Sequence, residues 1–153
     1  MKYWPLISLV VIAGLAATAL SSGFEMRSWM HYFMGFFLCQ FAMLKIFHPG
    51  GFADGFSMYD LIASRWRLYG YIYPLIELGL GLGYLSFFAP VWVYSVTMIV
   101  LGIGAIGVVR SLLRGLDLRC ACMGTVLDVP LSTVTLTEDV AMIAMAALLL
   151  YNM

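Results

Sequence analysis

The sequence predicts an all-α fold: a polytopic membrane helical bundle with about five transmembrane helices plus one interfacial amphipathic helix. Composition is the first reason, because 63% of the residues are hydrophobic and 10% are charged, against roughly 45–50% and 25% in a soluble domain. The second reason is that the sequence contains several apolar runs, each close to the roughly 20 residues that a helix needs to cross a bilayer. A chain of 153 residues needs most of its length for such runs, so we expect a single domain over residues 1–153.

The first two apolar runs are residues 3–20 and 29–47. The first run also fits a cleaved secretory signal, because Ala17-Thr18-Ala19 resembles a cleavage site, and the sequence leaves this alternative open. An aromatic cluster suited to a membrane interface opens the second run. Pro49 and two glycines follow it, which predicts that a helix ends there.

The longest polar connection, residues 48–69, contains a second kind of pattern. Within residues 57–68, mostly apolar side chains recur at helical spacing. We therefore expect an interfacial amphipathic helix over residues 57–68. The face that it would bury comprises Met58, Leu61, Ile62, Arg65 and Leu68.

Two further runs, residues 71–88 and 91–113, are separated only by Ala89-Pro90. So short a turn predicts that the two helices are antiparallel neighbours. Both runs are rich in glycine, and small residues let helices approach closely in lipid. We expect the seam between these two helices to be formed by Gly79, Gly81, Gly83, Gly102, Gly104 and Gly107.

The fifth run ends near Tyr151. Thr135 and Glu138 fit a capping box at its start, and the acidic side chains of Glu138 and Asp139 suit the positive end of a helix. An earlier start at Pro130 also fits the sequence.

The distribution of cations predicts an orientation in the membrane. If all five runs cross, one face carries seven cations and the other carries only Arg27. The positive-inside rule then predicts a multi-pass protein of the inner (cytoplasmic) membrane, with the N-terminus and the Cys120–Cys122 loop in the cytoplasm and the C-terminus outside. Zero net charge gives no reason to expect a nucleic-acid partner. The seven cations are Lys2, Lys45, Arg65, Arg67, Arg110, Arg114 and Arg119.

The loop Arg119-Cys120-Ala121-Cys122-Met123-Gly124 carries the most reactive side chains. Two thiols one residue apart can ligate one ion together or form a small, strained disulfide. A reducing cytoplasm disfavours a permanent disulfide. Three interpretations of Cys120 and Cys122 stay open: reversible redox catalysis, soft-metal binding and packing without chemistry. No cofactor is certain; the thioether of Met123 would favour Cu(I) in the metal alternative.

Cys39 is the third cysteine of the chain. By helical rise it lies about 12 Å from the end of its span near Phe47. One hypothesis turns it toward the loop as a resolving cysteine or a third metal ligand. The alternative is a small buried hydrophobic residue.

Glu77 lies roughly two turns inside the third span. An intramembrane carboxylate is costly and normally has a partner in the bundle interior. Lys45 is the predicted partner, with Arg110 second, and the pair acts either as a structural clasp or in proton or ion handling. His31 and His48 lie near interfaces, and we interpret both as solvated side chains without a site.

Several of these features together resemble a known family. They are the segment Tyr73 to Gly81 containing Glu77, the glycine-rich span after it, the C-x-C-x-G motif and the last span opened by residues 131–139. The pattern is similar to the MauE/DoxX group of redox-associated membrane proteins, and to MauE in particular, over roughly residues 30–150. The resemblance implies a small helical bundle that supports thiol–disulfide chemistry or the maturation of disulfide-containing partners. It singles out Glu77, Cys120, Cys122 and Gly124.

These inferences predict an integral membrane thiol-redox protein in contact with lipid. Cys120 and Cys122 would exchange disulfides with a thioredoxin-like partner, or act in maturation of a partner protein. Whether this makes the chain an enzyme stays open. Maturation of exported proteins would require thiols outside, whereas the charges predict them inside. The alternatives are soft-metal binding or transport, and a non-catalytic accessory subunit of a larger membrane complex.

Overall fold

The computed structural model describes residues 4–21, 23, 25–115 and 133–153. Within these residues the chain forms six helices and no strands, which confirms the all-α prediction for the part of the chain that is described. By length and composition, α2 and α5 could each cross a membrane, and α1 is apolar but shorter. The helices are α1 (Trp4–Leu20), α2 (Met26–Phe47), α3 (Pro49–Ser57), α4 (Arg67–Ser86), α5 (Pro90–Leu113) and α6 (Thr133–Tyr151).

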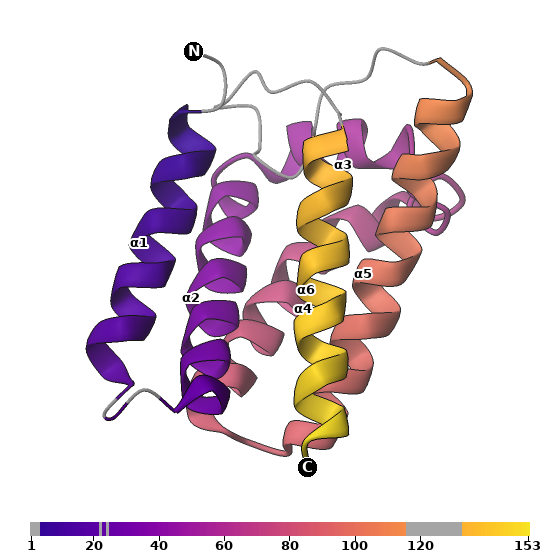
Figure 1. The fold of residues 1–153 in the computed structure, drawn as a ribbon. Coiled ribbons are helices and arrows are strands. Elements are labelled where there is room, and N and C mark those ends of the chain that lie inside the picture. Colours follow the sequence, from indigo (N-terminus) through magenta and orange to yellow (C-terminus); the bar gives the residue numbers. More distant parts are fainter. Residues whose placement is uncertain (1–3, 22, 24, 116–132) are drawn as a thin grey trace.

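The five long helices run side by side and alternate in direction, and the short α3 lies across one end of the bundle (Figure 1). We call this the α3 end; it also contains the starts of α1, α4 and α6 and the end of α5. The closest partners are α2 with α4, α5 with α6, and α1 with α2. A short turn at residues 87–89 joins α4 to α5, as the Ala89-Pro90 pair predicts.

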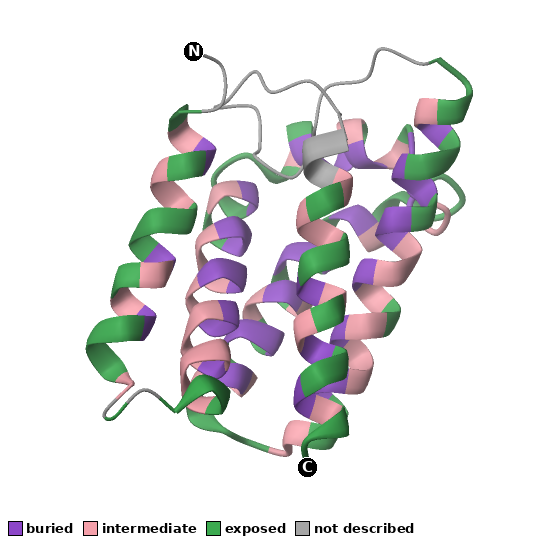
Figure 2. Cartoon of the chain, viewed as in Figure 1, coloured by how far each residue is buried: buried purple, intermediate pink, exposed green. Residues whose placement is uncertain are grey.

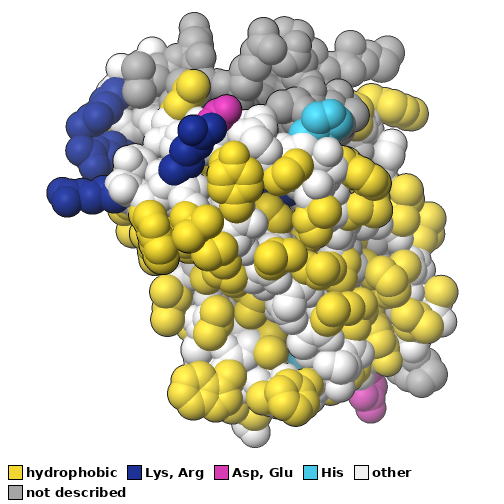
Figure 3. All heavy atoms as spheres, turned by 180° about the vertical axis from the view of Figure 1, so that it is seen from behind, with side chains coloured by type: hydrophobic (Ala, Val, Ile, Leu, Met, Phe, Trp, Pro, Cys, Tyr) yellow, Lys and Arg dark blue, Asp and Glu magenta, His cyan; other side chains and the backbone are white. Residues whose placement is uncertain are grey.

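Buried side chains face the interior of the bundle, while the outward faces of the helices are largely exposed (Figure 2). Much of the exposed surface is apolar, and Leu113, Phe88 and Trp92 are 84%, 74% and 74% exposed. In the view from behind, hydrophobic side chains are spread over the visible face of the bundle, whereas Lys and Arg gather toward the α3 end (Figure 3). Extended apolar surface of this kind marks contact with a partner or a membrane.

The predicted glycine seam between α4 and α5 is largely wrong. Gly81 instead faces α2, where an added Cβ would lie 2.7 Å from Cys39 Sγ and 3.0 Å from the Gly35 carbonyl oxygen. Gly83 does face α5, because its Cβ would lie 2.8 Å from Val93 Cγ2. Glycine therefore mediates a close contact of α2 with α4, and not only of α4 with α5. Among the described residues nothing lies within 4 Å of an added Cβ at Gly79, Gly102 or Gly104.

The predicted amphipathic helix at residues 57–68 is also wrong. The helix in this region is α3, which starts at Pro49 and ends at Ser57, and turns occupy most of residues 58–66. Asp60 explains the difference, because its Oδ1 accepts hydrogen bonds from the backbone N–H groups of Ile62 and Ala63, both at 2.9 Å. Such local side-chain bonds compete with helical ones.

Gly107 of α5 lets these turns pack directly on the bundle. A Cβ on Gly107 would lie 2.5 Å from the Tyr59 carbonyl oxygen and 3.2 Å from Asp60 Cα. Only a residue without a side chain permits such an approach of two backbones. Gly107 therefore serves the connection between α3 and α4 rather than a contact with α4.

Candidate functional site

A buried ion pair joins α2 to α4 near the α3 end of the bundle. Lys45 Nζ lies 2.5 Å from Glu77 Oε2, and the two side chains are only 2% and 6% exposed. The sequence predicts this pairing because a charge so deep in an apolar helix requires a partner. Removing one member of a pair this well shielded from water lowers the stability of a protein far more than removing one member of a surface pair.

Aromatic rings surround the ammonium group of Lys45. Its Nζ lies 4.9 Å from the ring centroid of Tyr73, 5.3 Å from that of Phe52 and 5.8 Å from that of Phe41. Phe41 comes from α2 itself, Phe52 from α3 and Tyr73 from α4, one turn before Glu77. The negative faces of aromatic rings attract a cation. These rings therefore compensate part of the hydration that Lys45 loses on burial.

Two more carboxylates line a cavity of about 20 Å³ beside the ion pair. They belong to Glu138 and Asp139 of α6, and the cavity is large enough for one water molecule. We call Lys45, Glu77, Glu138 and Asp139 the charge cluster. It combines one cation with three acidic side chains from α4 and α6, and such a surplus of carboxylates can hold a proton.

The other predicted site residues lie elsewhere. Cys120, Cys122 and Met123 are outside the described residues. Cys39 packs against Gly81 in the contact between α2 and α4, so its thiol faces a neighbouring helix. Since α6 starts at Thr133, Thr135 lies within its first turn rather than before it.

Among the described residues, no group of three or more His, Cys, Asp or Glu side chains is placed to hold a metal ion.

His31 is the polar residue that the sequence interpretation missed. It is 1% exposed rather than solvated. Its Nδ1 lies 3.1 Å from the Tyr84 carbonyl oxygen, and its Nε2 is hydrogen-bonded to the Tyr94 hydroxyl. Because a carbonyl can only accept, Nδ1 carries a proton. The ring also stacks on Phe87, with centroids 4.3 Å apart.

The sequence held one signal of this arrangement. Tyr84 and Tyr94 flank the turn between two antiparallel spans, at the bundle end where the second span begins, and His31 lies near that start. A histidine beside two tyrosines at one end of a bundle can bury its ring by bonding to them.

The fold and the buried ion pair place this protein among helical bundles that have helices long and apolar enough to cross a membrane and an ion pair in their interior. The family model described as methylamine utilisation protein MauE matches residues 4–152. The chain therefore belongs to the MauE family, which confirms the resemblance drawn from the sequence. No curated protein and no solved structure matches the chain.

Proposed function

We propose that this chain is an integral membrane thiol-redox protein in which Cys120 and Cys122 cycle between dithiol and disulfide. Exchange with a thioredoxin-like partner, or maturation of a partner protein, would use this pair. The observation that carries the proposal is the position of the C-x-C motif between α5 and α6, whose adjoining ends both lie at the α3 end. The charge cluster is near the same end, in the interior of the bundle.

The proposed chemistry is thiol–disulfide exchange. The thiolate of one cysteine attacks a sulfur of the partner disulfide, the partner S–S bond breaks, and a mixed disulfide forms. The second cysteine then attacks this bond, which closes the Cys120–Cys122 disulfide and releases the partner as a dithiol. The two protons lost by the pair balance the two that the partner thiolates gain. In this proposal the carboxylates of the charge cluster take part in holding these protons.

The proposal includes a topology of five membrane-crossing helices, α1, α2, α4, α5 and α6. The α3 end would face the cytoplasm, together with the N-terminus and the thiol pair, and the C-terminus would lie outside. The asymmetry of cations in the described chain supports this orientation. Lys45, Arg65, Arg67, Arg110 and Arg114 lie toward the α3 end, and Arg27 lies at the other.

A redox titration in membranes tests the chemistry. Samples equilibrated with dithiothreitol mixtures and trapped by a mass-tagging thiol reagent should show two thiols that oxidise together and reversibly. The transition should vanish in the C120S/C122S double variant and persist in C39S, which serves as the matched control. Thiols that never oxidise would contradict the proposal. If the wild type with such thiols binds copper and the C120S/C122S variant does not, the metal alternative would be favoured.

The orientation needs a separate experiment. A membrane-impermeant thiol reagent should label Cys120 and Cys122 in inverted vesicles, where the cytoplasmic face is outside. Labelling in right-side-out vesicles alone would contradict the proposed topology. Thiols on the outer face would, in turn, agree with a role in the maturation of exported proteins.

A further inference from the structure

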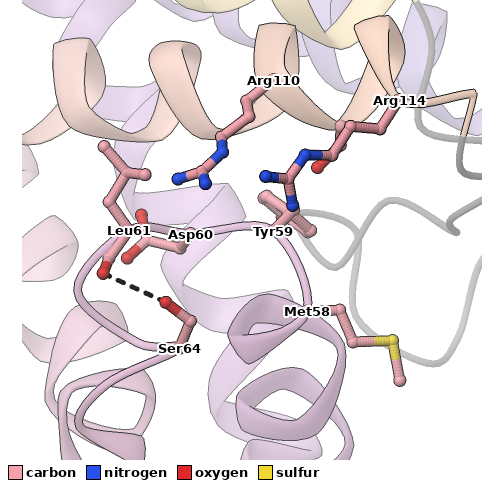
Figure 4. A pocket seen from close by; sticks show the side chains of 8 residues that line it. Met58, Tyr59, Asp60, Leu61, Ser64, Arg110 and Arg114 are labelled. Carbon is pink, nitrogen blue, oxygen red and sulfur yellow. Dashed lines mark hydrogen bonds between the residues drawn. The ribbon is translucent and has the colours of Figure 1, made fainter.

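A second, larger cavity lies at the α3 end between the 58–66 connection and the last turns of α5 (Figure 4). Its volume is about 180 Å³, against about 20 Å³ for the cavity beside the ion pair. None of its lining residues belongs to the charge cluster or to the proposed thiol pair. The lining comprises Met58, Tyr59, Asp60, Leu61, Ser64, Arg110, Ser111 and Arg114.

Two guanidinium groups form one wall of this cavity. Arg110 lies in the last turn of α5 and Arg114 is the residue that follows this helix, and both side chains extend toward the Tyr59–Asp60 backbone (Figure 4). The ion pairs in the described part of the chain involve Lys45 and Arg67, not these two arginines. Arg110 therefore faces this cavity and is not the partner of Glu77.

A buried carboxyl group forms the opposite wall. Asp60 is 1% exposed, and its Oδ1 accepts the two backbone bonds that hold the turn. Its Oδ2 has no hydrogen-bond partner among the described residues. Buried polar atoms in native proteins are normally satisfied, so an unsatisfied oxygen in the wall of a cavity points to a missing donor.

The position of Asp60 is set by backbone packing. Gly107 allows the Tyr59 and Asp60 backbone to contact α5 one turn before Ser111. The fold thus holds the Asp60 backbone against the part of α5 that is followed by Arg110 and Arg114. A ligand that fits this arrangement carries a negative group for the arginines and a hydrogen-bond donor for Asp60.

The surface next to the cavity is apolar. Ile106, Val109 and Leu113 are 58%, 38% and 84% exposed, and their spacing places them on the face of α5 that also carries Arg110. Met58, which lines the cavity, is 64% exposed. An acyl chain along this stripe would cover the apolar side chains while its headgroup lies at the arginines. This favours a membrane lipid over a water-soluble ligand.

We propose that the cavity binds the headgroup of an aminophospholipid of the phosphatidylethanolamine type. The phosphate would bind Arg110 and Arg114, whose planar guanidinium groups match phosphate oxygens. The ammonium group would donate to Asp60 Oδ2 and offset the repulsion between a carboxylate and a phosphate in one cavity. The lipid would thereby hold the 58–66 connection against α5 at the membrane surface.

Native mass spectrometry of the purified full-length protein tests this proposal. The protein in mild detergent is titrated separately with phosphatidylethanolamine, phosphatidylglycerol and phosphatidylcholine of identical acyl chains. Phosphatidylethanolamine should bind about tenfold more tightly than phosphatidylcholine, whose quaternary amine has no N–H to donate. The R110Q/R114Q double variant should bind it at least about tenfold more weakly than the wild type. Arg65, exposed at the same end but outside the cavity lining, provides the matched control R65Q, which should bind as the wild type does.

The D60N variant separates the amine contact from the phosphate contact. Asparagine retains an oxygen for the backbone bonds of the turn, so the connection should keep its conformation. The preference for phosphatidylethanolamine over phosphatidylcholine should then fall to about twofold or less, since the carboxylate charge is lost. Equal binding of all three lipids by the wild type would overturn the proposal. An equal loss of affinity for phosphatidylethanolamine in R65Q and R110Q/R114Q would overturn it too. Tight binding of inorganic phosphate or free phosphoethanolamine without lipid binding would overturn it as well and assign the cavity to a soluble ligand.

Discussion

Lys45 and Glu77 form an ion pair across α2 and α4 in which both side chains are almost completely shielded from solvent. A second ion pair, Arg67 with Asp54, joins the start of α4 to α3, but its side chains are 63% and 58% exposed. The two pairs connect neighbouring parts of the same fold and differ mainly in burial. They therefore allow the effect of burial to be measured within one protein.

Removing one member of the buried pair should destabilise the protein strongly. K45M leaves the Glu77 carboxylate without its ammonium partner, and E77Q leaves the ammonium without its carboxylate. Each should cost about 3–5 kcal/mol, because the remaining charge stays buried without its partner in this ion pair. The double variant K45M/E77Q should cost less than the sum of the single changes, because it removes both charges of the pair. Denaturant unfolding in detergent micelles, analysed as a double-mutant cycle, gives these free energies.

The exposed pair supplies the control for this cycle. R67Q and D54N should each change the free energy of unfolding by about 1 kcal/mol or less, as exposed pairs do. Similar costs at the two pairs would show that burial does not set the contribution of an ion pair in this fold. A role of Glu77 in proton handling, beyond a clasp, requires E77Q to change thiol oxidation at a temperature where the variant remains folded.

Substitution of Gly81 should loosen the contact between α2 and α4. An alanine Cβ there would meet Cys39 Sγ at 2.7 Å and backbone atoms of Cys39 and Gly35 at 3.0 Å. Because backbone cannot yield as a side chain can, we expect G81A to cost about 1–3 kcal/mol. Gly79 lies on the same helix with nothing within 4 Å of an added Cβ. G79A should therefore be neutral or stabilising by up to about 1 kcal/mol in the same unfolding measurement.

The His31 network should contribute to stability at the end of the bundle opposite α3. Y94F removes the hydroxyl bonded to His31 Nε2 and leaves a buried ring nitrogen without that partner. We expect a cost of about 1–3 kcal/mol. Tyr71 is 39% exposed, so Y71F is a suitable control and should change stability by less than about 0.5 kcal/mol. Equal effects of Y94F and Y71F would show that the His31 bond contributes little.

Features that depend on one segment of sequence were predictable in this chain, and features that depend on which helix faces meet were not. The depth of Glu77 in an apolar run and the position of Lys45 near the end of another indicated their pairing. In contrast, the glycines of α4 could face either neighbour, and only packing shows that Gly81 faces α2. His31 lies near a span end, as the sequence indicates, but its burial depends on tyrosines brought from two other helices.

The helix predicted for the 58–66 connection does not form, for a local reason. Apolar side chains at helical spacing favoured a helix, but Asp60 bonds to backbone groups two and three residues ahead, and Gly107 admits the resulting turn against α5. The first effect could be anticipated from the sequence, because an aspartate side chain can compete with helical hydrogen bonds. The second was not, because nothing local to residues 58–66 indicates a glycine of α5.

Asp60 should make the stability of this connection depend on pH. Burial raises the pKa of its carboxyl above the ordinary value of 3.8, and the backbone bonds from Ala63 and Ile62, which lower it, offset this only in part. The folded protein therefore holds the Asp60 proton at pH values where the unfolded chain has lost it. The penalty from burying the carboxylate is absent below pH 3.8 and grows as pH rises toward the folded pKa.

D60N removes this penalty while keeping an oxygen for the turn. In lipid-free detergent, the melting temperature of D60N minus that of the wild type should therefore be larger at pH 7 than at pH 4. D54N, which alters an exposed carboxylate on α3, should show a smaller change between the two pH values. Added phosphatidylethanolamine should reduce the D60N advantage at pH 7, because an ammonium at Asp60 Oδ2 would stabilise the wild-type carboxylate. A D60N difference that stays constant from pH 4 to pH 7 would show that the Asp60 carboxyl titrates alike in the folded and unfolded states.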